Sequence, residues 1–242
     1  MEKIAVITGA DRGLGLALTA ALLEKGWRVF AGQYLCDWPE LGALSQRYGE
    51  QLKIVALDVA SQESVQAVAQ SIGGAAERVD LLINNAGINA ASRERTLREK
   101  PDYDEMLTLY NVNALGPLRC VEALLPLMDR GAMRRLCFVS SEAGSIGCAE
   151  RKAWYSYCMS KAALNMGVKN IFNLLRPEGY TFRLYHPGWM RSYIGGSKGT
   201  RAPMEPEEAA VPALAHFLED YGDEKTEDQL VMKDWRGREW PW

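Results

Sequence analysis

The chain has little of what a metal centre or a disulfide framework needs. Only two of its 242 residues are histidines, His186 and His216, and they lie far apart. The five cysteines are an odd number and include no C-x-x-C pair, which argues against structural disulfides and a zinc site and favours a reducing compartment. We therefore expect no metal and a cytoplasmic location.

A strong charge of one sign and a long apolar run are also lacking. The net charge is −3 and the isoelectric point is near 5.6, which gives no basis for binding nucleic acid. No apolar run approaches the roughly 20 residues of a membrane helix, and the apolar stretch at the N-terminus is too short for a signal peptide. We expect neither a nucleic-acid nor a membrane partner.

Short apolar segments alternate along the chain with longer segments of helical periodicity. Strands are expected at 4–8, 28–32, 52–57, 81–84, 136–140, 181–185 and near 229–232, and helices at 14–25, 64–72, 103–128, 155–175 and 206–218. This alternation is typical of βαβ units, and no repeat or linker divides the chain. The sequence predicts an α/β fold: a single doubly wound Rossmann-type domain over 1–242, with a parallel seven-stranded sheet and helices on both faces.

Two segments interrupt this rhythm. Residues 90–101 are dense in mixed charge, and we interpret them as a solvated surface excursion rather than as a substrate gate. Residues 192–203 contain Gly195, Gly196 and Gly199 and follow a strand that is expected to border the site; a mobile lid and a plain loop are equally compatible with them.

Tyr157 and Lys161 are the first candidates for chemistry. Four residues is about one helical turn, so both side chains would project from one face of the 155–175 helix. The ammonium group would lower the pKa of the phenol from about 10 toward neutrality, so that the tyrosine could donate or accept a proton. The spacing alone is a weak signal, because a half-buried tyrosine beside a solvated lysine would share it.

Residues 8–15, T-G-A-D-R-G-L-G, follow the first expected strand and open the first expected helix. Glycines there allow a tight turn and let backbone N–H groups approach a pyrophosphate at the positive end of the helix. The alternative is a turn whose glycines serve packing only.

Taken together, these motifs resemble the classical short-chain dehydrogenase/reductase family. The resemblance covers the whole chain and includes Asn84-Asn85-Ala86-Gly87, Asn113, Ser141 and Pro187-Gly188. Residues 115–117, 144–146 and 237–242 are similar to the C-factor/sniffer-like carbonyl reductase branch. The resemblance implies an oxidoreductase that transfers a hydride between a nicotinamide cofactor and a small carbonyl or alcohol.

The resemblance also implies four catalytic residues. Tyr157 would be the general acid/base, and Lys161 would lower its pKa and bind the nicotinamide ribose. Ser141 would orient the substrate oxygen, with Ser140 and Ser145 as competing candidates. Asn113 would hold a water that connects Lys161 to bulk solvent, unless it is merely a polar residue that kinks its helix.

The cofactor-binding residues implied by the family lie at the ends of the strands. They are Thr8, Gly9, Asp11, Arg12, Gly13, Leu14, Gly15, Gln33, Asp58, Val59, Asn85, Ala86, Gly87, Tyr157, Lys161, Pro187, Gly188, Met190 and Ser192. Asp58 could instead cap the following helix. Gln33 stands where NAD enzymes carry an acid, and Arg12 lies in the glycine loop, which favours NADP(H) over NAD(H), although Asp37 could reverse this preference.

The residues expected to line the substrate pocket are large and mostly apolar: Ile88, Ser141, Trp154, Trp189 and Tyr193. They favour a hydrophobic aldehyde, ketone or quinone. The interval from Ser141 to Tyr157 is long for the family, and the extra residues around 148–152 could shape this pocket.

Two further expectations follow from the resemblance. Relatives use the 155–175 helix and the long helix before it for subunit contacts, so we expect a homodimer or homotetramer. The aromatic C-terminus, with Trp235, Trp240 and Trp242, is expected to dock on the domain or on a neighbouring subunit. The alternative to an enzyme is a cofactor-binding signalling or sensor protein with little turnover.

Overall fold

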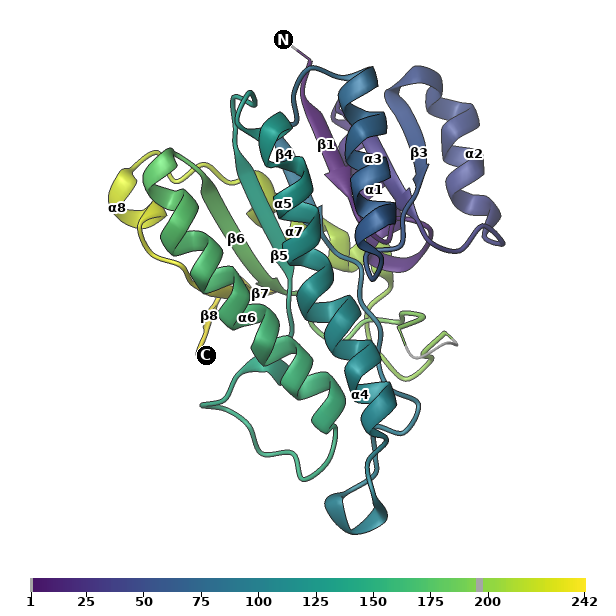
Figure 1. Ribbon diagram of the computed structural model, residues 1–242, viewed down its shortest axis with the longest axis vertical. Coiled ribbons are helices and arrows are strands. Elements are labelled where there is room, and N and C mark those ends of the chain that lie inside the picture. The colour runs from purple at the N-terminus through teal and green to yellow at the C-terminus, as the bar shows by residue number, and fades with distance from the viewer. Residues whose placement is uncertain (1, 195–197) are drawn as a thin grey trace.

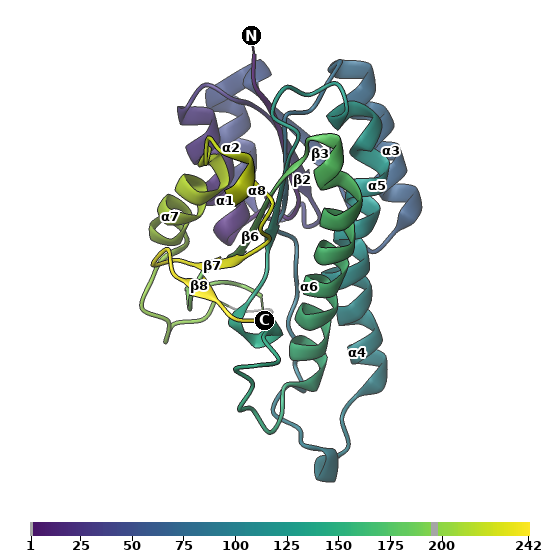
Figure 2. The same cartoon turned by 90° about the vertical axis from the view of Figure 1, so that its left-hand side faces the viewer.

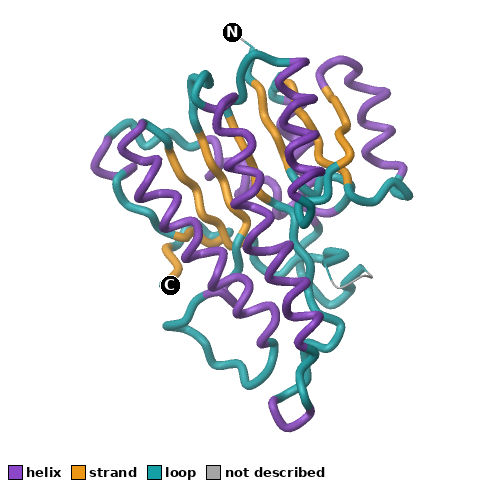
Figure 3. Tube along the Cα trace, viewed as in Figure 1, coloured by secondary structure: helices purple, strands orange, loops and turns teal. Residues whose placement is uncertain are grey.

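One sheet of eight strands organises the part of the chain that the computed structural model describes, residues 2–194 and 198–242. The strands are β1 (Ile4–Ile7), β2 (Arg28–Gln33), β3 (Leu52–Ala56), β4 (Leu81–Asn84), β5 (Arg135–Val139), β6 (Thr181–His186), β7 (Met232–Asp234) and β8 (Glu239–Trp240). Their spatial order is β3-β2-β1-β4-β5-β6-β7-β8, with every neighbouring pair parallel except β7 and β8 (Figure 3).

The eighth strand corrects the predicted count of seven. β8 pairs antiparallel with β7 through a turn in which the Asp234 carboxylate accepts hydrogen bonds from the backbone N–H groups of Arg236, at 2.8 Å, and Arg238, at 3.0 Å. A two-residue strand has no periodicity of its own, so the sequence carries no signal for it. The rest of the doubly wound architecture is as predicted.

Helices cover both faces of the sheet (Figure 2). One face carries α1 (Gly13–Glu24), α2 (Pro39–Tyr48) and α7 (Pro206–Leu218). The other carries α3 (Gln62–Ala75), α4 (Tyr103–Tyr110), α5 (Gly116–Met128) and α6 (Tyr155–Leu175), and a short α8 (Glu224–Glu227) lies near the C-terminus. The sequence analysis missed α2, although Leu41, Leu44 and Tyr48 recur at helical spacing and pack against the core.

The sheet has one hydrophobic core on each face, because successive side chains of a strand point to opposite faces. In β1, Ile4 and Val6 pack toward the α3, α5 and α6 layer, whereas Ala5 and Ile7 pack toward α1 and α7. A sheet that is buried on both faces needs continuous apolar strands of this kind.

The expected helix over 103–128 is interrupted by a π-helical turn, Asn111–Leu115. Pro117 has no N–H to donate to the carbonyl of Asn113, four residues earlier, which favours the wider turn. The interruption turns the side chain of Asn113 into the protein, where it is fully buried.

Loops gather beyond one end of the sheet. Figure 1 shows that the segment between β4 and α4 and the segment between β5 and α6 both extend past the carboxyl ends of the strands. In a doubly wound fold this is the end where ligands bind. Within the described residues, no helix combines the length and the apolar character that crossing a membrane requires.

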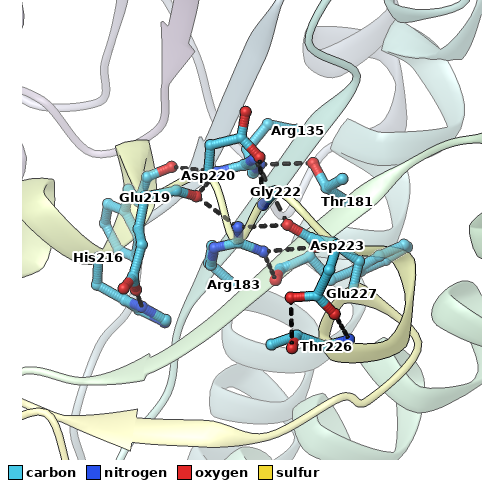
Figure 4. A network of polar contacts seen from close by, with 12 residues as sticks. Arg135, Thr181, Arg183, His216, Glu219, Asp220, Gly222, Asp223, Thr226 and Glu227 are labelled. Atoms are coloured by element: carbon cyan, nitrogen blue, oxygen red, sulfur yellow. Dashed lines mark hydrogen bonds and ion pairs between the residues drawn. The ribbon is translucent and has the colours of Figure 1, made fainter.

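A buried ionic cluster fastens the C-terminal region to the opposite end of β5 and β6 (Figure 4). Arg183, which is 1% exposed, donates to both carboxylate oxygens of Glu227 at 2.7 and 2.9 Å. Arg135 lies 3.9 Å from the same carboxylate and donates to the carbonyl of Glu219 at 2.7 Å. Glu227 is therefore the counter-charge for two buried guanidinium groups.

Glu227→Gln should lower the free energy of unfolding by about 3 kcal/mol, because it leaves two buried arginines without a counter-charge. Urea denaturation followed by circular dichroism measures the effect. Glu224→Gln is the matched control, since Glu224 is exposed on the same short helix. Equal stability of the two variants would contradict this assignment.

Candidate active site

The glycine loop is constrained by close backbone contacts between β1 and α1. A Cβ atom at Gly15 would lie 2.0 Å from the carbonyl oxygen of Gly9, and a Cβ atom at Gly9 would lie 2.9 Å from the Cα atom of Ala86. Gly9 and Gly13 also have φ angles of 63° and 57°, in the left-handed region that favours glycine. Gly9 and Gly15 are thus required by close contacts, whereas Gly13 is favoured by its φ angle alone. Nothing lies within 4 Å of a Cβ atom placed at Gly13, so the loop is open on that side.

Thr8 and Asn85 tie the glycine loop to the end of β4. The Thr8 hydroxyl oxygen accepts hydrogen bonds from the backbone N–H groups of Asn85, at 3.0 Å, and Ala86, at 2.9 Å. The Asn85 side-chain amide donates back to the carbonyls of Thr8 and Gly9, both at 3.0 Å. Strand order reverses between β1 and β4, so this junction borders the crevice where a dinucleotide binds in such sheets. The turn, its open side at Gly13 and the start of α1 suit a pyrophosphate.

Arg12 lies between two segments that are far apart in the sequence. Its guanidinium carbon is 5.0 Å from the ring centroid of Trp38 and 5.4 Å from that of Tyr193, and the two rings meet edge to face at 4.5 Å. Tyr193, which was expected to line the substrate pocket, thus contacts the residues after β2. Sequence reasoning did not select Trp38, although its place just after β2 was an available signal.

Asp58 and Val59 follow β3, at the carboxyl end of the sheet. The Asp58 carboxylate accepts from the backbone N–H of Ala60 at 2.8 Å, whereas α3 is capped by Ser61, whose hydroxyl accepts from the N–H of Ser64 at 3.2 Å. The alternative role of Asp58 as the helix cap is therefore wrong. Val59 packs against the start of α5, where a Cβ atom at Gly116 would lie 2.9 Å from it.

Asn113 holds the chain that follows β4. Its side-chain oxygen accepts from the N–H of Ile88 at 2.9 Å, and its amide donates to the carbonyl of Ile88 at 2.9 Å and to the Ser160 hydroxyl at 3.0 Å. A Cβ atom at Gly87 would lie 3.3 Å from the Asn113 side-chain oxygen and 3.6 Å from Lys161 Nζ. The π-helical turn therefore brings Asn113, Gly87 and Lys161 together.

The three serines after β5 have different partners. The Ser140 hydroxyl donates to Asn165 at 2.6 Å, and that of Ser145 accepts from the N–H of Cys148 at 3.3 Å. Ser141 accepts from the N–H of Ala143 at 3.2 Å, and its side chain is near enough to Tyr157 to oppose the rise in the pKa of the phenol. Ser141 is the serine that faces the tyrosine.

The electrostatics of the Tyr157–Lys161 pair differ from expectation. Burial raises the pKa of Tyr157 to about 12, against a smaller lowering by its hydrogen bond to Ser141. Burial also lowers the pKa of Lys161 to about 8, while its Nζ atom donates to the carbonyl of Val139 at 3.0 Å and lies 5.8 Å from the Tyr157 ring centroid. The expected lowering of the tyrosine pKa is wrong for this arrangement, because loss of hydration is the largest effect on each group.

The residues after β6 form the opposite side of the site. Gly188 packs under Trp235, Met190 bridges to Met204, and Trp189 is 63% exposed. Pro187 and Ser192 lie on the same segment, and Arg191 is bound to Glu205 at 2.6 Å. Gly195 and Gly196, on which the lid interpretation depends, lie outside the described residues.

His186 and the aromatic C-terminus form one packed cluster beside this segment. The imidazole meets the rings of Trp235 and Trp240 at 5.2 and 5.7 Å, and burial lowers the pKa of His186 to about 4. The carbonyl of Trp242 accepts from the N–H of Gly147 at 2.9 Å. The C-terminus thus docks on its own domain.

The chain is similar to known proteins of one family. The protein-family model described as short chain dehydrogenase matches residues 3–202 of this chain. The protein named C-signal from Myxococcus xanthus is 37% identical over 164 residues, which are 68% of this chain and 93% of that protein. The 1-hydroxy-2-glutathionyl-2-methyl-3-butene dehydrogenase of Rhodococcus sp. (strain AD45) is 32% identical over 213 residues, 88% of this chain and 89% of that protein. The NADPH-bound carbonyl reductase from chicken fatty liver superposes with a TM-score of 0.86 at 28% identity, covering 100% of this chain and 99% of that one.

Proposed function

The chain belongs to the short-chain dehydrogenase family, and on that premise we propose that it is an NADP(H)-preferring oxidoreductase that interconverts small, apolar carbonyl compounds and alcohols. The observation that carries the proposal is the convergence of Ser141, Tyr157 and Lys161 beside the glycine-loop crevice. The solved carbonyl reductase that it resembles over its whole length supports this reaction class.

Proton transfer is the part of the reaction that the chain's own residues perform. The bound nicotinamide would supply a hydride to the carbonyl carbon. Tyr157, with its pKa raised to about 12, is protonated at neutral pH and can give its proton to the carbonyl oxygen, while Ser141 lies beside the same phenol. This protonation state suits the direction of reduction. Lys161, whose pKa is lowered to about 8, can help to restore the proton.

The preference for NADP(H) rests on charge near the end of β2. Gln33 provides no carboxylate there, and the nearby Asp11 carboxylate accepts from the backbone N–H of Tyr34 at 3.3 Å. Arg12 offers a guanidinium group at the edge of the same crevice, held by the faces of Trp38 and Tyr193. A 2′-phosphate would find the Arg12 cation in this place, and the Asp11 carboxylate, 3.9 Å from Arg12, is already engaged with that cation and with the backbone of Tyr34.

A signalling or sensor protein is the second candidate, favoured by the 37% identity to the protein named C-signal. Such a protein would bind the cofactor with little turnover. The placement of Ser141 and Lys161 beside Tyr157 argues for an enzyme, because a sensor has no need of a positioned acid.

We propose that the molecule is a homodimer or homotetramer and resides in the reducing cytoplasm. Helices α4 and α6 pack side by side, and each exposes large apolar side chains. These are Tyr103, Leu107 and Tyr110 on α4, and Met159, Met166 and Leu174 on α6. Exposed apolar side chains on two neighbouring helices suit a contact with a second copy of the chain. The five free cysteines suit a reducing compartment.

Tyr157→Phe should reduce kcat for carbonyl reduction by about 10²–10⁴-fold, because the general acid is removed. Cofactor affinity, measured by the fluorescence of bound NADPH, should stay within about twofold, since the ring remains and only one hydroxyl is lost. Tyr155→Phe is the control: its hydroxyl donates to the carbonyl of Lys152, outside the site.

Because the phenol of Tyr157 is protonated at neutral pH, the rate of alcohol oxidation by the unmodified protein should increase as the pH rises above 7. A panel of aldehydes, ketones and quinones that gives no turnover with either cofactor would favour the sensor.

Arg12→Ala should raise KM for NADPH about tenfold, because a charge-assisted contact with the phosphate is lost. KM for NADH should change less than about twofold, since NADH lacks the phosphate. Arg47→Ala, on exposed α2 surface, is the matched control. A higher kcat/KM with NADH than with NADPH in the unmodified protein would reverse the proposed preference.

Leu107→Glu should shift the mass measured by light scattering from an oligomer toward the 26.9 kDa monomer, because a charge is placed in the apolar surface. Leu97→Glu is the control, since Leu97 is equally exposed but lies on the 90–101 excursion. A monomeric unmodified protein would contradict the proposed assembly.

A further inference from the structure

Trp154 has an unusual backbone conformation at the start of the catalytic helix. It precedes the first residue of α6 and has a φ angle of 65° and a ψ angle of 28°. A bulky residue in the left-handed region is strained, and such a conformation persists only when surrounding contacts hold it. The side chain of Trp154 provides those contacts.

Two loops meet on the Trp154 indole. From the 90–101 excursion, the Arg93 guanidinium lies 5.3 Å from the ring, and Glu94 accepts from the indole N–H at 3.0 Å. From the segment between β5 and α6, the Arg151 guanidinium lies 5.2 Å from the ring. The backbone N–H of Trp154 also donates to the carbonyl of Arg93 at 2.8 Å. The indole is therefore in contact with one cation from each loop.

Each of these arginines already has a carboxylate partner on its own loop. Arg93 lies 3.4 Å from Glu94, and Arg151 donates to both oxygens of Glu142 at 2.6 and 2.8 Å. Residues 90–101 and 145–153 both carry a net positive charge, so net charge does not draw the two loops together. Trp154 is what joins them: its indole makes two cation–π contacts and the hydrogen bond to Glu94, and its backbone N–H adds the hydrogen bond to Arg93. The excursion is thus not only a solvated surface segment, as its composition suggested.

The same indole contacts Tyr157. The two rings meet edge to face with centroids 6.4 Å apart. This contact fixes one side of the phenol ring. The segment that carries Arg151 is held in turn by the C-terminus, at Gly147.

We infer that Trp154 is a positioning residue that joins the 90–101 excursion to the 145–153 segment and thereby holds Tyr157 in place for proton transfer. This inference rests on the proposed function for its effect on turnover. The contact that Trp154 makes between the two loops can be tested without any substrate.

The test compares Trp154→Gly and Trp154→Phe. Glycine adopts a left-handed backbone without strain, so the first variant removes the ring but keeps the start of α6. We expect its kcat to fall about tenfold or more, with NADPH affinity within about twofold, because the acid is misplaced while the cofactor site is intact. Phenylalanine keeps an aromatic ring between the two arginines and should restore kcat to within about threefold.

The contact between the loops is measured by limited digestion with trypsin. Arg95 and Arg98 are exposed on the excursion, and cleavage after them should accelerate several-fold in Trp154→Gly and much less in Trp154→Phe. Asn170→Ala is the matched control, since Asn170 is an exposed residue of α6 outside both loops, and the variant should leave both kcat and these cleavages unchanged.

The inference requires that Trp154→Gly both lowers kcat and accelerates cleavage of the 90–101 excursion. It is overturned if Trp154→Gly keeps the unmodified kcat, if its excursion is cleaved at the unmodified rate, or if phenylalanine restores neither. If the unmodified protein reduced no carbonyl, the proposed function would fail instead, and unaltered cleavage in Trp154→Gly would still overturn the contact between the loops.

Discussion

The site is arranged around the hydrogen bonds that hold the carboxyl ends of β1 and β4 together. The Thr8 hydroxyl accepts two backbone N–H groups, and the Asn85 amide returns two hydrogen bonds to the glycine loop. This reciprocal arrangement satisfies groups that would otherwise be buried without partners. It also sets the close approach that only glycine allows at Gly15, and it directs the chain at Gly87 toward Lys161 on α6.

From that junction a chain of contacts leads to the proton-transfer residues. Asn113 holds Ile88 through the π-helical turn, and its side chain also receives support from Ser160 on α6. Lys161 completes this layer with its ammonium group on the carbonyl of Val139. Because the layer is buried, both titratable groups are shifted toward their neutral forms, upward for the Tyr157 pKa and downward for the Lys161 pKa. An environment of this kind favours a protonated phenol.

The sheet supports the cofactor crevice, whereas the loops beyond it define the rest of the site. Tyr193 is placed against Arg12 and Trp38, and Trp154 joins the two loops beside Tyr157. The C-terminus adds a further restraint at Gly147. The substrate side of the site is therefore assembled from segments that are distant in sequence, and each is fixed by aromatic packing rather than by regular secondary structure.

The sequence by itself determined the doubly wound fold, because continuous apolar strands and periodic helices repeat in a fixed order. It also determined the glycine loop and the Tyr157–Lys161 spacing, since these are local patterns within one turn or one helix. It could not indicate β8, whose two residues pair only in the context of the rest of the domain. The sequence also could not give the direction in which the pKa of Tyr157 shifts, because the spacing indicates a nearby cation but not the loss of hydration. Only the tertiary structure decided that Tyr193 contacts Arg12 and that Trp154 joins two loops, because contacts between distant segments leave no periodic pattern in the chain.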